Sequence, residues 1–308
     1  MKEQKKMSEL VGLWKSDKKQ YVKKSTFSAY MLLLENHLLP TFGESYQIEE
    51  KDVQSFVFKK LKSGLSQKTI KDILIVLKMV LKFGAKQKCF EYTPFDIQYP
   101  TERDRQNIEV LNRTDQKKIM NYIQQHFTFR NLGVYICLSG GIRIGEICAL
   151  TWGDIDTDNG IINVRQTIQR IYVVDDSVRK TELLLDTPKT KNSIREIPMS
   201  RDLLCMLKPI KKIVNDSFFV LTNDAKPTEP RTYRTYYKNM MKELGMPKLK
   251  FHGLRHSFAT RCIESNCDYK TVSVLLGHSN ISTTLNLYVH PNLEQKKKTI
   301  EQMFKGLR

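Results

Sequence analysis

Hydrophobic residues recur at helical spacing through residues 1–90. Four segments carry this pattern, separated by glycine, proline or polar breaks: residues 8–15, 25–40, 48–61 and 66–83. Ser25 and Ser66 begin the second and fourth segments, where a serine side chain can cap free backbone N–H groups. Pro40 and Gly43 end the second segment. We therefore predict a compact domain of four helices.

The sequence changes character between residues 92 and 107. Pro94 and Pro100 interrupt it, and the charged run 101–105 follows. Such a stretch is typical of a connection between domains. We predict an N-terminal helical domain at residues 1–100, a linker at 101–109 and a second domain at 110–308.

The second domain is expected to combine helices with a small sheet. Helical spacing appears at 114–126, 131–139 and 143–150, with Thr114 as a cap candidate, and returns near Arg201. Between these helices, β-branched and alternating runs predict four strands: 161–164, 170–174, 183–185 and 195–198. The predicted fold class is mainly α with a small antiparallel sheet, a four-helix N-terminal domain being followed by a mixed α+β domain.

The composition is that of a globular protein. Of its 308 residues, 40% are hydrophobic and 27% charged, and no apolar run reaches the roughly 18 residues that span a bilayer. The N-terminus is charged and lacks an apolar signal region, so we expect a cytoplasmic protein without a membrane partner. The six cysteines form no CxxC pair, which favours free thiols in a reducing compartment over a metal or disulfide framework.

The net charge of +18 is spread along the chain, with +7 in residues 1–105 and +11 in the remainder. Excess positive charge attracts polyanions and raises their encounter rate. A basic surface without any specific partner would account for the same net charge. The charge therefore points to nucleic acid as a partner and says nothing about chemistry.

Two arginines could form a clamp for a phosphate. Arg143 follows a pair of glycines, and Arg255 lies three residues after His252. A guanidinium stays charged at physiological pH and offers a planar fork of donors. If residues 251–262 form a helix, His252 and Arg255 project from one face near its N-terminus, where free N–H groups favour an anion. Taken singly, these residues fit an exposed helix face equally well.

A histidine and a tyrosine complete the set. Tyr288 lies ten residues after His278, and Ser279 is a cap candidate for the helix between them. Histidine moves protons near neutral pH, whereas tyrosine, with a pKa near ~10, is a weak nucleophile until its proton is removed. Four of the six histidines fall within 252–290, but no CxxC pair accompanies them, which argues against zinc. The set suits attack on a phosphodiester without a metal.

Taken in order, these motifs resemble the tyrosine recombinases, or phage-type integrases, in the branch carried by mobile elements. The boxes of that family stand at 141–146 (GIRIGE), 252–255 (HGLR), 276–278 (LGH) and Tyr288. The one difference is Ile142 where the family usually has leucine. The likeness covers about residues 8–300, and the helical N-terminal half resembles the core-site DNA-binding domain of the family.

The resemblance implies a catalytic site made of Arg143, Lys189, His252, Arg255, His278 and Tyr288. Tyr288 would attack the scissile phosphate and form a 3′-phosphotyrosine, the two arginines and His278 would stabilise the developing charge, and His252 would move the tyrosine proton. Glu146 would orient Arg143 or the histidine. The leaving 5′ oxygen would take its proton from a hairpin lysine, either Lys189, which matches a PKT-like phrase of the family, or Lys191.

The resemblance also implies partners. Double-stranded DNA attachment sites would be the substrate and a homotetramer the active assembly, with an excisionase or a DNA-bending factor as further candidates. The phosphotyrosine conserves bond energy, so neither a metal nor ATP is expected as a cofactor. Residues 291–308 resemble the tail that such recombinases dock onto a neighbour, and packing on their own domain is the alternative.

The long hairpin region, residues 164–189, favours the integrase of a prophage or conjugative transposon over a chromosome-dimer resolvase. Two rivals come from other classes. One is a DNA-binding regulator that no longer cuts, and the presence of every expected polar residue argues against it. The other is a topoisomerase of related chemistry, which would act as a monomer.

Overall fold

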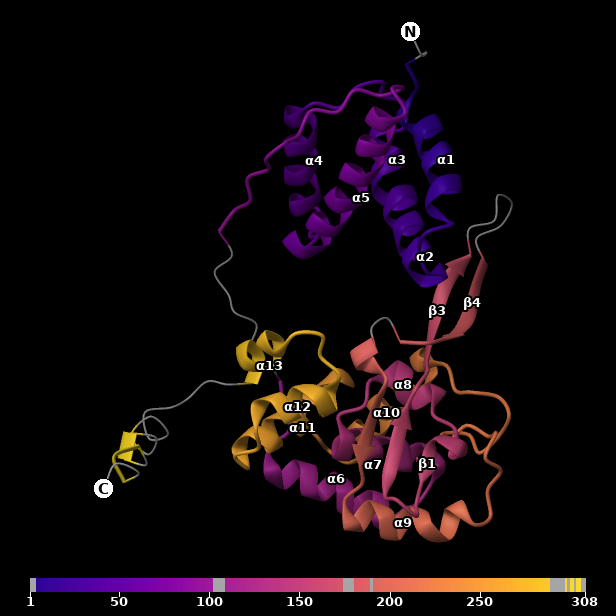
Figure 1. Cartoon of the computed structure of the whole chain (residues 1–308), viewed down its shortest axis with the longest axis vertical. Coiled ribbons are helices and arrows are strands. Elements are labelled where there is room, and N and C mark those ends of the chain that lie inside the picture. Colours follow the sequence, from indigo (N-terminus) through magenta and orange to yellow (C-terminus); the bar gives the residue numbers. More distant parts are fainter. Residues whose placement is uncertain are drawn as a thin grey trace. The chain divides into compact units, whose positions relative to one another are not determined.

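The computed structural model describes residues 4–101, 109–173, 180–188 and 191–288, together with 297, 300–301 and 303–305; of residues 191 and 286–288 it describes the backbone alone. The chain divides into two compact units, which are described separately (Figure 1). One contains residues 1–105 and 170–184, and the other contains residues 106–169 and 185–308. The domain boundaries inferred from the sequence remain a prediction.

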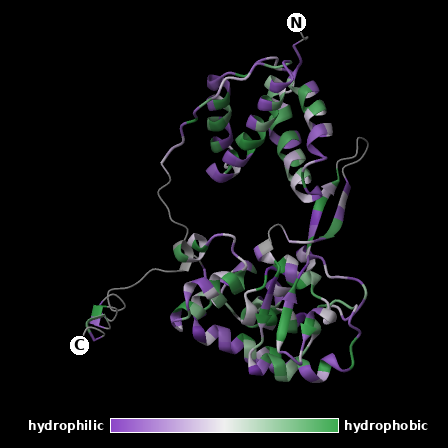
Figure 2. Cartoon of the chain, in the orientation of Figure 1, coloured by the Kyte–Doolittle hydropathy of each residue, from purple (hydrophilic) through white to green (hydrophobic). Residues whose placement is uncertain are grey.

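The first unit is helical, as its spacing predicts. Its helices are α1 (Met7–Lys18), α2 (Lys24–Leu33), α3 (Leu39–Phe42), α4 (Glu50–Lys62) and α5 (Gln67–Lys86). Figure 2 shows both hydrophobic and hydrophilic residues on these helices, and the buried apolar residues of α1, α2, α4 and α5 form one core. Ser66 caps α5 as predicted, its hydroxyl accepting from the backbone N–H of Thr69. The Ser25 prediction is wrong, because α2 begins at Lys24 and Ser25 is buried within its first turn.

The helix that contains Pro40 does not break there. A π-helical turn, Leu34–Leu38, joins α2 to α3, and Gly43 ends α3. Leu39 donates its N–H to the carbonyl of Leu34, one residue further back than in an α-helix. A proline ring clashes with the carbonyl four residues before it, and the wider turn accommodates this.

Two paired strands belong in part to this unit, which contains residues 170–184 of the chain. They are β3 (Thr167–Val173) and β4 (Lys180–Asp186), and Figure 1 shows them beside α2. Tyr172 makes the contact: its backbone N–H donates to the hydroxyl of Ser28 (2.8 Å) and its phenol to the carboxylate of Glu35 (3.1 Å).

The second unit surrounds a three-stranded antiparallel sheet with helices. The strand order is β1 (Ile155–Asp156), β2 (Ile161–Val164) and β5 (Arg195–Pro198). Its helices are α6 (Arg113–Gln125), α7 (Phe129–Gly140), α8 (Ile144–Ala149), α9 (Arg201–Lys211), α10 (Pro230–Glu243), α11 (His252–Glu264), α12 (Tyr269–Leu276) and α13 (Ile281–Tyr288). The predicted fold class, mainly helical with small antiparallel sheets, is confirmed.

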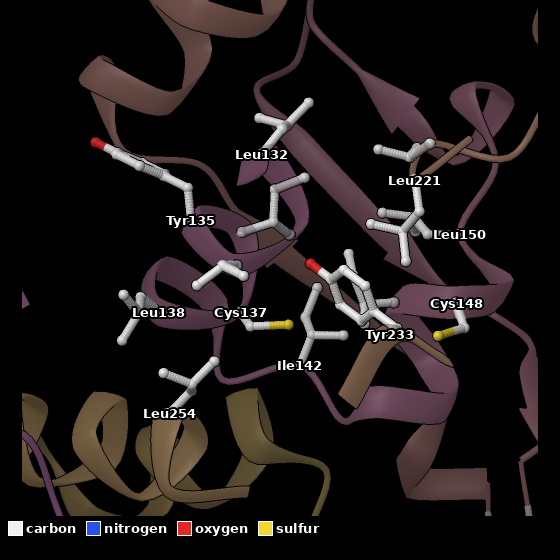
Figure 3. Packing of buried hydrophobic residues seen from close by; sticks show 14 of the residues in the cluster. Leu132, Tyr135, Cys137, Leu138, Ile142, Cys148, Leu150, Leu221, Tyr233 and Leu254 are labelled. Atoms are coloured by element: carbon white, nitrogen blue, oxygen red, sulfur yellow. The ribbon is translucent and has the colours of Figure 1, made fainter. Parts of the chain in front are cut away.

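Helix α7 lies at the centre of the second core. Every residue from Asn131 to Leu138 is buried, and Figure 3 shows Leu132, Cys137 and Leu138 packed with Ile142 and Tyr233. A helix that is apolar on all sides belongs in a core. The Thr114 prediction is wrong, because Asn112 caps α6 through its side-chain oxygen.

Candidate active site

Arg143 is placed by a sharp turn after α7. Gly141 ends that helix in the left-handed region, at φ +62°. A Cβ at this position would lie 2.6 Å from the ring of Phe258, so only glycine fits. Arg143 follows two residues later as the N-cap of α8, and its side chain stays one-third exposed.

Glu146 connects Arg143 to a second arginine. One carboxylate oxygen accepts from the guanidinium of Arg143 (2.7 Å), and the other accepts from the backbone N–H of Arg143 (3.0 Å) and from the guanidinium of Arg195 (2.9 Å). Burial opposes ionisation of the carboxyl, but the two arginines outweigh it and hold the pKa of Glu146 below its usual value. Glu146 is therefore a buried anion that contacts both Arg143 and Arg195.

Arg195 is a site residue that the sequence did not reveal. Its strand alternates inward and outward residues, and Arg195 shares the buried side with Ile197. Besides Glu146, its guanidinium donates to the backbone carbonyls of Leu275 (2.6 Å) and Ser193 (3.1 Å). An arginine at an inward position of a strand, three residues before a proline, is the signal that could have found it.

Arg255 lies on the first turn of α11 and is almost completely buried, with 2% exposed. Its guanidinium donates to the carbonyl of Gly141 (2.7 Å) and to that of Leu276. It therefore ties the turn before Arg143 to the end of α12. The helix predicted at 251–262 is confirmed, with His252 and Arg255 three residues apart at its start.

Three arginines bind the C-terminal end of α12. The carbonyls of Leu275, Leu276 and Gly277 accept from Arg195, Arg255 and Arg143 in turn. The last carbonyls of a helix have no partner within it and carry partial negative charge, which cations stabilise. His278 follows directly, so the three arginines hold the histidine at a fixed place relative to Arg143.

The turn into His278 depends on Gly277, which adopts φ +64°. The half-buried ring of His278 shares a hydrogen bond of 2.8 Å between Nδ1 and the hydroxyl of Thr284. Burial, reinforced by the positive charges of Arg255, Arg143 and Arg195, lowers the pKa of His278 to about 4.

Asn280, rather than Ser279, starts the helix after His278. Its side-chain oxygen accepts from the N–H of Ser282 (2.8 Å) and its carbonyl from that of Thr283 (3.1 Å). The cap expected at Ser279 is therefore wrong by one residue.

His252 stands at the start of α11, with part of its surface in solvent. Its ring lies edge-on to that of His256, with 4.6 Å between centroids. Burial by neighbouring protein atoms lowers the pKa of His252 from its usual value. The nearby His256, Arg255 and Arg143 lower it further. The ring is thus neutral near pH 7 and able to accept a proton.

Arg143 and His278 line one cleft of about 400 Å³. The other lining residues come from four segments of the same unit: Glu146, Thr167, Gln169, Asp186, Thr187, Pro188, Ser193, Gly277, Ser279 and Thr283. A cleft of this size admits a phosphodiester group, and a guanidinium beside an imidazole supplies hydrogen-bond donors for its oxygens. Arg255 and His252 are not among the residues that line it.

Three predicted site residues fall wholly or partly outside the described structure. Lys189 is not described, and of Lys191 only the backbone is, in the short 3-10 turn Lys191–Ser193. Tyr288 is the last residue of α13, and its side chain is likewise not described. Pro188 and Ser193, on either side of the two lysines, line the cleft. The predicted tail helix at 291–308 is also outside the described residues, apart from a few isolated positions.

Further features of the described part of the chain are the grouping of its metal-ligating residue types, the state of its cysteines and the hydropathy of its helices. No group of three metal-ligating side chains occurs there, and all six cysteines are free. None of its helices is both long and apolar enough to span a bilayer.

The comparisons with known proteins agree with these motifs. Residues 109–295 match the phage integrase family, and residues 6–61 match the SAM-like N-terminal domain of phage integrases. A XerC-like tyrosine recombinase of Caldanaerobacter subterraneus is 31% identical over 279 residues, which are 83% of this chain and 71% of that protein. The transposase of transposon Tn916 from Enterococcus faecalis is 25% identical over 280 residues, or 84% and 67% of the two chains.

A solved structure shares the fold. The Tn1549 transposon integrase, in complex with transposon right end DNA, superposes with a TM-score of 0.78, covering 97% of this chain and 99% of that one at 22% identity. The family match spans more than half of the chain, and the relatives named above include a transposase of a mobile element. This chain therefore belongs to the phage integrase family, as a tyrosine recombinase of the mobile-element type.

Proposed function

We propose that the protein is a site-specific recombinase that cuts and rejoins double-stranded DNA at attachment sites, integrating or excising a prophage or conjugative transposon. The observation that carries this proposal is the placing of Arg143 and His278 in one cleft, on a turn that Arg255 also binds. A set of donors held in advance around one phosphate-sized space stabilises a charged transition state without further reorganisation.

The proposed reaction begins at Tyr288. Its phenolic oxygen attacks the scissile phosphorus and forms a 3′-phosphotyrosine, while the bond from phosphorus to the 5′ oxygen breaks. His252 accepts the tyrosine proton, consistent with an imidazole that is neutral near pH 7. Arg143, Arg255 and His278 stabilise the developing negative charge, Arg143 and His278 from the lining of the cleft and Arg255 from the turn behind it. The 5′ hydroxyl of a second strand then reverses the step, so no external energy source is consumed.

The leaving 5′ oxygen needs a proton, and we assign this to Lys189, with Lys191 as the alternative. Pro188, directly before Lys189, and Ser193, two residues after Lys191, both line the cleft. A 5′ sulfur leaves without a proton. Lys189→Ala should therefore cleave ordinary DNA slowly and recover on a substrate with sulfur at the bridging position. If Lys189→Ala does not recover on that substrate and Lys191→Ala does, the proton donor is Lys191.

We further propose that the helices of the first unit bind the core site, and that four protomers assemble on DNA. The solved relatives include a lambda integrase tetramer bound to a Holliday junction. The net charge of +18 supports binding to a polyanion. An excisionase or a DNA-bending factor is a candidate partner in the same assembly.

A covalent adduct tests the central step. The wild-type chain should form a denaturant-resistant adduct with nicked duplexes that span the junction of the element, whereas Tyr288→Phe should bind the same DNA and form none. Tyr269→Phe, which changes an exposed tyrosine of the same unit, should behave as wild type. An adduct in Tyr288→Phe would refute the assignment of the nucleophile. Binding without cleavage by the wild type would favour the regulator.

A further inference from the structure

Thr284 places a buried hydroxyl within hydrogen-bond distance of the ring of His278. It is fully buried on α13 (0% exposed), and its hydroxyl oxygen lies 2.8 Å from Nδ1 of His278. Helix α13 ends one turn later at Tyr288. One hydrogen bond therefore joins the loop that carries the histidine to the helix that carries the tyrosine.

The direction of this hydrogen bond follows from what each partner can donate. A threonine hydroxyl has one hydrogen, and within the described residues its contact with His278 is its one hydrogen bond. If Nδ1 carried the hydrogen, the buried hydroxyl would have to point its own hydrogen at no acceptor. Leaving a buried donor unpaired costs about 1–3 kcal/mol. The hydroxyl therefore donates, and Nδ1 accepts.

This direction fixes where the hydrogen of the imidazole is. Burial and the neighbouring arginines lower the pKa of His278 to about 4, so the ring is neutral near pH 7. A neutral imidazole has one N–H. With Nδ1 accepting, that N–H is at Nε2.

We propose that Thr284 is a positioning residue that holds His278 in the tautomer with hydrogen on Nε2, so that a neutral imidazole donates a hydrogen bond to an oxygen of the scissile phosphate. The assignment of the tautomer stands on the geometry alone, and the contact with phosphate rests on the proposed function. The same bond would keep α13, and with it the backbone of Tyr288, in register with His278.

The tautomer is measured on the full chain without DNA. Nitrogen-15 spectra of histidine-labelled protein at pH 7, with His278→Gln to assign the signal, should show Nε2 protonated and Nδ1 as a hydrogen-bonded acceptor. In Thr284→Ser the signal of Nδ1 should stay in place, and in Thr284→Val it should move to that of an acceptor without a partner. A protonated Nδ1, or a charged ring, in the wild type would overturn the proposal.

The role is measured by the rate of adduct formation in a single turnover at saturating DNA. Thr284→Val keeps the shape of the side chain and removes the hydroxyl, and we expect it to be about tenfold slower with unchanged DNA affinity, the effect of one lost hydrogen bond. Thr284→Ser should stay within about twofold of the wild type. Thr235→Val is the control, because among the described residues the exposed Thr235 bonds through its hydroxyl to its own helix, at the carbonyl of Arg231.

Each outcome decides one question. Equal rates for Thr284→Val and wild type, or a serine variant as slow as valine, would rule out the positioning role. Absence of an adduct in every chain, the wild type included, would instead contradict the proposed function, and the nitrogen-15 result would still decide the tautomer. If Thr284→Val does not fold, as judged by circular dichroism, the serine variant and the wild-type spectrum still test the proposal.

Discussion

Glu146 forms ion pairs with two arginines from different elements. Its carboxylate is 3% exposed and contacts both Arg143 and Arg195 within 3.0 Å. Arginine stays charged in proteins, so removing the anion leaves the buried guanidinium of Arg195 without a counter-charge. The carboxylate therefore stabilises the unit that contains the cleft as well as the position of Arg143.

Glu146→Gln should lower the free energy of unfolding by about 3 kcal/mol, the cost of breaking a buried ion pair from one side. Chemical denaturation of the full chain measures this. The matched control is Glu44→Gln, whose carboxylate pairs with Lys6 at the surface, is 83% exposed, and should contribute less than about 1 kcal/mol. Equal losses for the two variants would show that Arg195 does not depend on Glu146.

The depressed pKa of Glu146 also gives stability a pH dependence. A carboxyl that ionises more easily in the folded state stabilises the protein above its unfolded pKa, about 4.3 for glutamate. The contribution is lost as pH falls further, through the folded pKa. Unfolding titrations should therefore show stability falling more steeply below about pH 4.3 in the wild type than in Glu146→Gln. Parallel curves would disprove the linkage.

His278 changes stability in the same direction as Glu146, but over a higher pH range, because its folded pKa is also lowered. Its folded pKa of about 4 lies below the ordinary value of about 6.5, so the unfolded chain binds more protons between these values. The groups that disfavour its proton, after burial, are Arg255, Arg143, Arg195 and His252. An NMR titration should show His278 neutral from pH 8 down to about 5, and His278→Gln should lose less stability than wild type between about pH 6.5 and 4. A midpoint near 6.5 would contradict this environment.

At the scale of elements, the C-terminal end of α12 organises the site. Its last carbonyls accept hydrogen bonds from three arginine side chains. Gly277 then adopts a left-handed turn, and His278 is the next residue. A Cβ on Gly277 would lie 2.8 Å from the backbone carbonyl oxygen of Asn192, so the turn is both left-handed and tightly packed.

Gly277→Ala should therefore lower the free energy of unfolding by more than the cost of placing an alanine in the left-handed region, because the added Cβ is also crowded. Gly245 provides the comparison, because it has nearly the same φ (+62° against +64°) and nothing within 4 Å of its Cβ position. Gly245→Ala should reduce the free energy of unfolding by about 1–2 kcal/mol, and Gly277→Ala by roughly 1–3 kcal/mol more, the cost of overpacking. Equal melting temperatures for the two variants would show that crowding at Asn192 does not matter.

The sequence predicted the long helices and four of the five described strands, two of them, 161–164 and 195–198, with the observed bounds. Apolar residues at helical spacing carry much information in a long segment, and α5, with its Ser66 cap, was found on that basis. β1 has two residues, too few for a period to appear. Pro40 and Gly43 predicted the end of the second helical segment, and the helix does end at Phe42 with Gly43 as its cap, but the π-helical turn before Pro40 was not predicted.

The site was predicted from the order of its motifs, and the contacts between them were not. Arg143 and Arg255 donate to neighbouring carbonyls, of Gly277 and Leu276, just before His278, which no spacing in the sequence could show. Arg195 was missed because a charged residue in a strand reads as solvent-exposed unless its partners are known. Thr284 was likewise invisible, since its role depends on the ring it contacts.

For the whole molecule, charge is the property that bears most directly on the proposed substrate. With a net charge of +18, binding of duplex DNA should release many counterions. Affinity measured by fluorescence anisotropy should fall about 10³–10⁵-fold between 50 and 200 mM salt, as expected for 6–10 phosphate contacts. Heparin, a competing polyanion, should inhibit cleavage, and its inhibition should also weaken as the salt concentration rises. A binding constant that hardly changes with salt would contradict DNA as the ligand of this surface.

We expect this chain to form a covalent bond to DNA through one tyrosine, Tyr288. The most direct measurement is mass spectrometry of the trapped adduct after digestion with nuclease and protease. Nucleotide mass should appear on the peptide that contains Tyr288, joined through a 3′ phosphate. The same mass on any other peptide, or a link through a 5′ phosphate, would contradict the account.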